Sequence, residues 1–344
     1  MGNEITEAIE KFEMHNEIKI SNYYFKTGKF NSALIKDSFI GSDIFENNIK
    51  EWLEICENEQ DRHYLLLLLS HFDYFPENRY NFEISRLVDK LKERLMTIEK
   101  TIFVIFMSKK GTASGGDNVS AALKLATMGE VRKEYIITDV ERASDDLKLN
   151  LCQVSSIVFI DDIIGSGKTL YSNIDNFMSR FKDDIGECTD LIIASLCGRE
   201  KKIKRKIRQL EKLHNRKFDY ENLYPVKKSL DECKILDKFG KKRIENIETN
   251  IEKNATCDNG KTYIMGFDRN QLLVGFYYNT PNNTLSLFWR PSKISVPLFG
   301  RTSYKRPSIN ECREQKRKMK ENAYELGRMR NNGVSNSDDY SIIY

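Results

Sequence analysis

The chain has 344 residues, with 55 lysines and arginines against 51 aspartates and glutamates, so its formal net charge is +4. Hydrophobic residues make up 40% of it, enough for ordinary cores, which argues against a mainly disordered chain. Only 6 prolines and 18 glycines argue against a collagen-like or low-complexity protein. The length suggests two domains.

The sequence shows no membrane span and no export signal. Its densest apolar runs, such as Tyr64–Leu69 and Thr101–Met107, fall far short of the roughly 20 residues that cross a bilayer. The N-terminus carries glutamates instead of a basic region. The 7 cysteines form no Cys-x-x-Cys pair, which argues against a zinc site and for reduced thiols. We therefore expect a cytoplasmic protein without membrane contact.

Residues 1–98 form the first predicted domain, and their pattern favours helices. Acidic residues outnumber basic ones there. Five consecutive leucines, Leu65–Leu69, predict a helix that is buried nearly all round and that Pro76 ends. We expect a helical bundle with a structural or docking role. The apolar spacing predicts helices over Ser42–Asn58, Asp61–Phe72 and Phe82–Ile98.

From residue 101 onward, short apolar strands alternate with helices. This alternation predicts an α/β fold, an open and mostly parallel sheet with helices on both faces. We assign residues 99–300 to this second domain and residues 301–344 to a basic helical extension with a mobile tail. The predicted strands are Thr101–Met107, Glu134–Thr138, Ser156–Ile160, Leu191–Leu196 and Gln271–Tyr278, and the helices are Asn118–Met128, Thr169–Phe181 and Arg199–His214.

The segment Ile157–Thr169 carries the clearest chemistry. A buried strand ends in two adjacent carboxylates, Asp161 and Asp162, and a tight Gly-Ser-Gly turn leads into a helix. Ligands of open α/β sheets bind beyond the carboxyl ends of the strands. A helix N-terminus suits a phosphate, because it has free N–H groups and the positive end of the helix dipole. Glycines have no side chain, so they let the phosphate approach the backbone closely. Since carboxylates repel a phosphate, we expect the acids to face hydroxyls or a divalent metal.

A P-loop is one interpretation of this segment. Gly167, Lys168 and Thr169 fit the end of the motif G-x-x-x-x-G-K-[ST]. Its first glycine would stand at position 162, where Asp162 would point a carboxylate into the phosphate nest. A P-loop ATPase remains an alternative hypothesis, which Lys168→Ala tests through ATP hydrolysis.

A second interpretation fits the segment better. Ile157–Thr169 resembles the signature of the type I phosphoribosyltransferases: four apolar residues, two acids, two apolar residues and a small turn that ends in Thr. Lys168 departs from that pattern, since a glycine is common there. The resemblance implies binding of phosphoribosyl diphosphate with Mg²⁺ and reaction at the anomeric carbon. It implies that Asp161 and Asp162 bind the ribose hydroxyls and, indirectly, the Mg²⁺, and that Gly165, Ser166, Gly167, Lys168 and Thr169 hold the 5-phosphate.

Other segments correspond to further parts of the same family. The loop 139–150, which contains Arg142, matches a mobile catalytic loop in position, and residues 263–300 match the hood that contacts the base. A solvated turn or a buried strand explains these segments about as well. The resemblance assigns a diphosphate loop to Ser108, Lys109, Lys110, Gly111, Ser114, Gly115 and Gly116, and base contacts to Tyr278, Asn279, Asn282 and Asn283.

The segment Thr280–Leu285 resembles one subgroup of this family more specifically. It is similar to a string in phosphoribosyltransferase-like effectors of bacterial conflict and antiphage operons, including retrons, which also carry an N-terminal helical region. This resemblance covers roughly residues 50–300. It implies a defence effector, with a retron DNA–RNA and its reverse transcriptase as partners.

Two basic segments show that the small net charge hides an uneven distribution. Lys201–Lys217 has nine bases and one acid, and Lys305–Lys320 has seven bases and two acids. Apolar residues at helical spacing, ending with Leu213, predict an amphipathic helix in the first segment. Its cationic face could attract a phosphate backbone, although a solvated helix is also an explanation. A non-catalytic module that senses a nucleotide and docks nucleic acid therefore remains an alternative, and the oligomeric state stays open. The basic patch comprises Lys201, Lys202, Lys204, Arg205, Lys206 and Arg208.

Overall fold

The structure is a computed structural model, and all the residues that it describes belong to one compact unit. Among the predicted features, the loop Ser108–Ser114, the loop 139–150 and residues 301–344 lie outside the described residues. Gly115 and Gly116 are described. The described residues are 2–20, 42–95, 97–105, 115–131, 135–138, 151–225, 230–231, 234–255 and 261–300.

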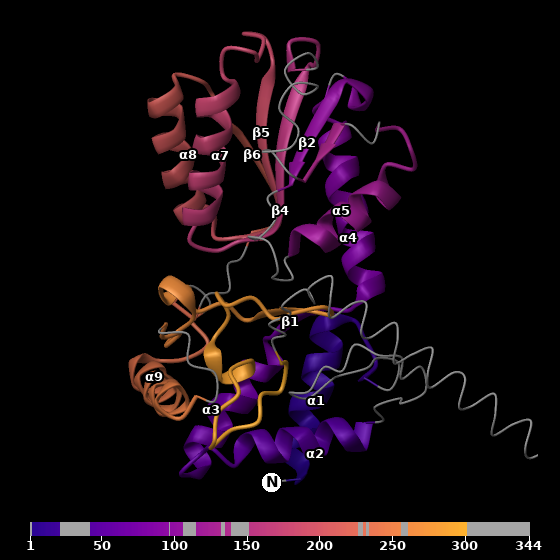
Figure 1. The fold of residues 1–344 in the computed structure, drawn as a ribbon. Helices are drawn as coiled ribbons and strands as arrows, with labels where there is room; N and C mark the ends of the chain where they lie inside the picture. Colours follow the sequence, from indigo (N-terminus) through magenta and orange to yellow (C-terminus); the bar gives the residue numbers. More distant parts are fainter. Residues whose placement is uncertain are drawn as a thin grey trace, which may run out of the picture. The chain divides into compact units, whose positions relative to one another are not determined.

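Five parallel strands form the main sheet, in the order β3-β2-β4-β5-β6. Helices α4 and α5 lie on one side of this sheet and α7 and α8 on the other (Figure 1). The predicted α/β fold is therefore confirmed. The strands are β2 (Thr101–Ile105), β3 (Ile136–Ile137), β4 (Ser156–Ile164), β5 (Asp190–Gly198) and β6 (Asp219–Pro225), and the helices are α4 (Glu77–Lys92), α5 (Gly115–Ala126), α7 (Lys168–Phe181) and α8 (Glu200–His214).

The central strands are almost continuously apolar because helices cover both faces of the sheet. All five residues of β2 are buried, and so is the run Ile157–Ile160 of β4. On the α7 side of the sheet, the ring of Phe159 packs against Phe177 with centroids 5.3 Å apart. This core holds β4 and α7 firmly and so fixes the turn between them.

A second hydrophobic cluster joins the N-terminal helices to residues from 230 onward. Its largest member, Trp52, stacks on Phe288 and donates its indole N–H to the carbonyl of Leu287 at 2.8 Å. This cluster connects residues on both sides of the predicted domain boundary at residue 98. The boundaries at residues 98 and 300 stay predictions. The elements involved are α1 (Gly2–Asn16), α2 (Ser42–Leu53), α3 (Glu59–Ser70), α9 (Lys238–Lys253) and the short 3₁₀ segment η5 (Ser286–Phe288).

The first 98 residues also contain a strand, which the helical prediction missed. β1 (Asp73–Phe75) pairs in parallel with β7 (Val274–Phe276). The prediction that Pro76 ends the leucine-rich helix was wrong, since α3 ends at Ser70 and Pro76 precedes the first residue of α4. Its fixed φ, here −63°, suits an entry into a helix.

Several predicted boundaries differ from the observed ones. β4 extends to Ile164 and so contains both acids, whereas the sequence ended the strand at residue 160. β6 and α9 were not predicted, and β7 is shorter than the predicted strand Gln271–Tyr278. No helix in the described part of the chain is long and apolar enough to cross a membrane.

Candidate functional site

The acid pair lies inside β4 because its ladder with β5 continues past it. Asp161 pairs with Ser195 and Ile163 with Cys197. Side chains alternate between the two faces of a strand, so Asp161 and Asp162 start on opposite faces. Asp161 is partly exposed, whereas Asp162 is only 5% exposed.

Asp162 is enclosed by groups from three elements. One of its carboxylate oxygens accepts a hydrogen bond from the N–H of Ile163 at 2.6 Å, and the other accepts one from the hydroxyl of Tyr278. Gly115, the first residue of α5, lies directly against the carboxylate, since a Cβ there would stand 2.6 Å from the Asp162 Cγ. The expected diphosphate-loop residue Gly115 is therefore in contact with Asp162.

Asp161 has fewer described contacts. Its Oδ1 accepts a hydrogen bond from the N–H of Asp162 at 2.9 Å. Burial, and then the negative charge of Asp162, raise the pKa of the Asp161 carboxyl well above its usual range. A carboxyl in this setting gains from hydrogen-bond donors or a cation that compensate its charge.

The glycine turn between β4 and α7 consists of Gly165, Ser166 and Gly167. Gly167 has φ +71°, a left-handed conformation that glycine adopts without strain. The hydroxyl of Ser166 accepts a hydrogen bond from the N–H of Lys168 at 3.3 Å, and α7 begins at that residue. Thr169 is exposed in the first turn of α7. The predicted phosphate-binding residues therefore lie together at a helix N-terminus, where free N–H groups and the helix dipole favour an anion.

A chain of hydrogen bonds connects this turn to residues far away in the sequence. The side chain of Asn283 lies against Gly165, where an added Cβ would be 2.5 Å from its Oδ1. That oxygen accepts a hydrogen bond from Nδ2 of the fully buried Asn270 at 2.7 Å. The Oδ1 of Asn270 in turn accepts one from Nζ of Lys202 at 2.6 Å. Thus α8 and residues 270–283 support the glycine turn together.

Cationic side chains gather at the same place. Lys168 pairs with Asp268 through an Nζ–Oδ1 distance of 2.6 Å, and Lys202 lies 3.9 Å from the other oxygen of that carboxylate. Burial, and then the positive charge of Arg199, lower the pKa of the Lys202 ammonium. The stem of Lys206 lies 3.1 Å from where a Cβ of Gly167 would stand. These charges add to the attraction for an anion.

The predicted base-contact residues have other partners in the structure. The hydroxyl of Tyr278 bonds to Asp162, Asn279 closes a turn with Phe276, and the Asn282 carbonyl accepts a hydrogen bond from the N–H of Phe267. Their role toward a base stays a prediction. The sequence analysis missed Asp268 and Asn270. Glycine, aspartate and asparagine residues close together are typical of a turn, so the turn itself could have been predicted. Nothing in the sequence indicates which distant residues such a turn contacts.

The basic patch of α8 divides into two groups. Lys201, Lys204, Arg205 and Arg208 are exposed, whereas Lys202 and Lys206 are half-buried beside the glycine turn. The Nζ of Lys206 lies 4.9 Å from the ring centre of Tyr171, a cation–π distance. Leu213, predicted to belong to the buried stripe, is instead 55% exposed near the end of the helix.

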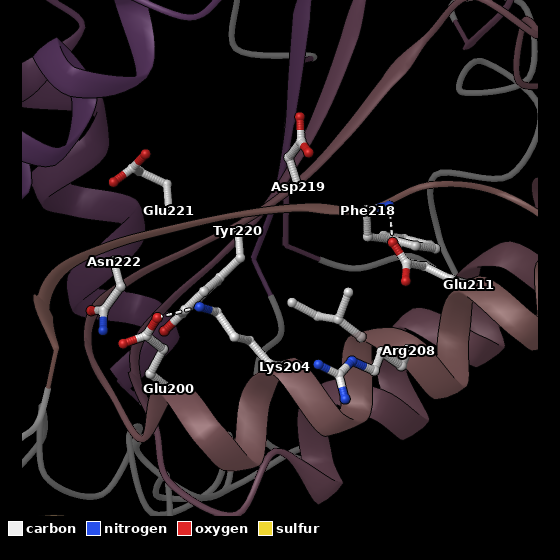
Figure 2. A pocket seen from close by; sticks show the side chains of 10 residues that line it. Glu200, Lys204, Arg208, Glu211, Phe218, Asp219, Tyr220, Glu221 and Asn222 are labelled. Atoms are coloured by element: carbon white, nitrogen blue, oxygen red, sulfur yellow. Dashed lines mark hydrogen bonds and ion pairs between the residues drawn. The ribbon is translucent and has the colours of Figure 1, made fainter.

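A cavity of about 460 Å³ lies between α8 and β6, but it contains none of the predicted catalytic or phosphate-binding residues (Figure 2). Three of its acidic groups have partners within the protein. Glu200 pairs with Lys204 at 2.5 Å, Glu211 accepts a hydrogen bond from the N–H of Phe218 at 3.2 Å, and Asp219 pairs with Arg94 at 3.0 Å. The candidate site therefore remains at the end of β4.

The acids at this site suit a metal that the ligand helps to bind. The described residues contain no group of three His, Cys, Asp or Glu side chains that could hold an ion by themselves. Magnesium is commonly bound through one or two carboxylates together with substrate phosphates. The partly exposed carboxylate of Asp161 fits that arrangement, with Asp162 contributing negative charge beside it.

The geometry does not suit a P-loop. That motif places four residues between its two glycines. Here only Gly165–Gly167 separate the last residue of β4 from the first residue of α7, and Asp162 lies inside the strand. The position of the first motif glycine is therefore held in the β-sheet.

A solved structure and a protein family are similar to this chain. The chain resembles the xanthine-guanine-hypoxanthine phosphoribosyltransferase of Helicobacter pylori, with 16% identity, 36% of this chain and 74% of that chain covered, and a TM-score of 0.23. No curated protein matches the chain. The PRTase-CE family matches residues 49–301, which include β1, the whole sheet and the segment up to Gly300. The chain therefore belongs to the PRTase-CE family of phosphoribosyltransferase-like conflict effectors.

Proposed function

We propose that the site binds phosphoribosyl diphosphate, or a related ribosyl phosphate nucleotide, together with Mg²⁺, and acts at the anomeric carbon. One observation supports this proposal above the others. A single strand–turn–helix segment brings an acid pair next to a glycine turn at a helix N-terminus. The two kinds of group match a ligand that has hydroxyls at one end and a phosphate at the other.

The 5-phosphate would lie at the glycine turn. The first residues of α7 offer N–H groups that have no carbonyl partner within the helix. The ammonium groups of Lys168 and Lys202 neutralise the phosphate from the side. Asp268 occupies these cations in the structure, so a phosphate would compete with its carboxylate for Lys168.

The ribose would lie over the acid pair. A carboxylate accepts hydrogen bonds from two vicinal hydroxyls, and these bonds orient the sugar so that its anomeric carbon faces the leaving group. Cleavage at that carbon has oxocarbenium character, as in glycoside hydrolysis, so a negative carboxylate nearby stabilises the transition state. The diphosphate would lie on the predicted diphosphate loop that precedes α5, and not at Gly115 itself, because the Asp162 carboxylate already lies against that residue.

Magnesium would be held by Asp161 and by the ligand's own oxygens. When bound, it supplies neutralisation of the charge that develops on the departing diphosphate. We assign no general base, so the proposal covers both transfer to an acceptor and hydrolysis.

Isothermal titration calorimetry tests the binding step. We expect phosphoribosyl diphosphate with Mg²⁺ to bind and ATP with Mg²⁺ to bind at least about tenfold more weakly, a difference of about 1.4 kcal/mol. A double variant, Asp161→Asn with Asp162→Asn, should abolish binding while far-ultraviolet circular dichroism stays unchanged. Tighter binding of ATP, or full binding by the double variant, would contradict the proposal.

We propose further that the protein acts as the effector of an antiphage system such as a retron, where it would damage a nucleotide pool or modify a cellular target. Membership of the PRTase-CE family supports a role in conflict. Expression without the rest of its system should slow bacterial growth, and the acid double variant should relieve that effect. Equal growth inhibition by the wild type and by the soluble double variant would contradict an enzymatic effector.

The exposed face of α8 supports a second candidate function, docking of nucleic acid such as a retron DNA–RNA. Lys201 and Arg205 are exposed on this face, and neither is part of the hydrogen-bond chain that supports the glycine turn. Reversing both charges to Glu should weaken DNA–RNA binding and reduce its salt dependence, as measured by fluorescence anisotropy. Binding that does not depend on salt or on these two residues would contradict docking through α8.

A further inference from the structure

The two adjacent carboxylates are held in different ways. Both oxygens of Asp162 accept hydrogen bonds, from the N–H of Ile163 and from the hydroxyl of Tyr278, and the side chain is 5% exposed. Asp161 is partly exposed, and its described hydrogen-bond partners both belong to Asp162: the N–H at 2.9 Å and the neighbouring carboxyl group. A ligand at Asp161 therefore replaces contacts with its neighbour Asp162 alone, whereas a ligand at Asp162 has to break contacts with three elements.

Tyr278 is held on Asp162 by a group of aromatic rings. Its ring stacks on Phe276 with centroids 5.6 Å apart and planes at 4°. Tyr80, which is fully buried, meets it edge to face at 5.5 Å, and Tyr277 does so at 5.1 Å. Aromatic packing of this kind fixes the ring and thus the direction of its hydroxyl. Tyr278 is therefore poorly suited to swing aside for each ligand.

The neighbouring Tyr277 provides a contrast. Its hydroxyl donates a hydrogen bond to Oδ1 of Asn118 on α5 at 3.1 Å and does not bond to the acid pair. Tyr277 and Tyr278 thus share the same segment and much of the same packing, but only the hydroxyl of Tyr278 bonds to Asp162.

The position of Gly115 shows that Asp162 also supports α5. The absence of a side chain there lets the start of the helix approach the carboxylate, which would otherwise collide with a Cβ. A negative charge at a helix N-terminus stabilises the helix. Asp162 thus connects β4 with α5 and with the segment that follows β7, and we call Asp162, Tyr278 and Gly115 the clamp.

Asp161 starts on the other face of the strand. Asp161 comes two residues after Phe159, so both side chains start on the same face of β4. The ring of Phe159 packs there against Phe177 of α7. The glycine turn lies at the beginning of this same helix. A ligand whose phosphate sits at the turn would therefore extend along the face on which Asp161 starts.

We infer that the acids have unequal roles: Asp161 contacts the hydroxyls of the ribosyl ligand, and Asp162 is a positioning residue that anchors the clamp. This assignment rests on the proposed function for the identity of the ligand. The clamp itself is defined by contacts within the protein, so it can be tested without any ligand.

The test compares four single variants that change few atoms: Asp161→Asn, Asp162→Asn, Tyr278→Phe and, as the matched control, Tyr277→Phe. Calorimetry with ribose 5-phosphate and Mg²⁺ measures the affinity of each. Asp161→Asn should weaken binding at least about tenfold, the usual cost of a lost charge-assisted hydrogen bond, without lowering the melting temperature. Asp162→Asn should weaken binding clearly less than Asp161→Asn does, and Tyr278→Phe should stay within about threefold of the wild-type affinity.

Stability measurements test the clamp independently. Asp162→Asn and Tyr278→Phe should each lower the midpoint of urea unfolding, and the double variant should be no less stable than the worse single one, because both remove the same interaction. Tyr277→Phe combined with Asp162→Asn should show additive losses. A coupling of this pattern is not expected of two residues that merely pack nearby.

Three results would overturn the inference. Equal loss of ribose 5-phosphate affinity in Asp161→Asn and Asp162→Asn would mean that both acids contact the ligand. Unchanged affinity in Asp161→Asn would remove its assigned role, and additive stability losses for Asp162→Asn and Tyr278→Phe would remove the clamp. If the wild type binds neither ribose 5-phosphate nor phosphoribosyl diphosphate, the proposed function fails, and the stability measurements still decide whether the clamp exists.

Discussion

The candidate site joins two segments that position their polar groups by opposite means. The segment Ile157–Thr169, which we call the regular segment, uses a strand ladder and a helix N-terminus. The segment 263–289, which we call the irregular segment, contains only three residues of strand and two short 3₁₀ turns. Its non-glycine residues with positive φ are Met265, Asp268, Arg269 and Gln271.

The two segments are also stabilised from different places. The regular segment is held by apolar packing on both faces of the sheet, as at Phe159. The irregular segment depends on a buried carboxylate of α9, since Glu248 accepts hydrogen bonds from the N–H of Met265 and from the N–H of Leu287, the latter at 3.1 Å. Unusual backbone persists only where the surroundings hold it in place. We therefore expect the irregular segment to tolerate change less well.

The largest effect is expected at Gly266. This glycine has φ +72°, and a Cβ there would stand 2.9 Å from the backbone carbonyl carbon of Asn283, which cannot move freely. Gly266→Ala should lower the free energy of unfolding by about 3–4 kcal/mol, from backbone strain and steric overlap together. The control is Gly129→Ala, because Gly129 has φ +84° but open space around it. Chemical denaturation should show a loss of only about 1 kcal/mol for the control; equal losses would contradict the steric argument.

The second effect concerns pH. Burial raises the pKa of Glu248 to about 7, so the folded protein holds a proton there that the unfolded chain releases near pH 4.5. The stability gained from this proton is complete below about pH 4.5 and disappears as the pH rises through about 7. The expected change is about 3 kcal/mol, from roughly 2.5 pKa units at 1.36 kcal/mol each.

Denaturant unfolding from pH 4.5 to pH 8 measures this change. Glu248→Gln should remove the corresponding part of the pH dependence while retaining one acceptor for the two N–H groups. A wild type and a variant with the same pH profile would show that Glu248 does not titrate in this range.

The third effect, at Gly165, tests the regular segment in the same way as Gly266 tests the irregular one. A Cβ at Gly165 would meet the side chain of Asn283 at 2.5 Å, and a side chain can shift more easily than a backbone. Gly165→Ala should therefore destabilise the protein by only about 1–2 kcal/mol. It should also weaken ribose 5-phosphate binding. A loss as large as that of Gly266→Ala would contradict the proposed difference between the segments.

The smallest effects are expected at the lysines that connect the segments. Lys202 is half-buried and bonds to the buried Asn270, so Lys202→Met should cost about 1–2 kcal/mol of stability. Lys168 is exposed, and its pair with Asp268 should contribute no more than about 0.5 kcal/mol. Thermal unfolding of the two variants at low and at high salt should separate these contributions. A larger loss in Lys168→Met would mean that the surface pair holds the segments together.

The same contrast explains what the sequence could predict. Apolar periodicity and glycine spacing are local, so they identified β2, β4, β5, α7 and the turn with its acids. The extension of β4 to Ile164 could not be predicted, because Asp162 is buried against Gly115 and against Tyr278, which lies 116 residues away in the sequence. The link between Lys202 and Asn270 spans 68 residues and leaves no periodic signal.

In the proposed function, the glycine turn and the partly exposed Asp161 receive one ribosyl phosphate. A crystal structure of the protein with phosphoribosyl diphosphate and Mg²⁺ tests it most directly. We expect the 5-phosphate against the N–H groups of Gly165–Thr169 and the ribose hydroxyls on Asp161, while Tyr278 stays bonded to Asp162. A ligand bound instead on the exposed face of α8, or in the cavity between α8 and β6, would contradict it.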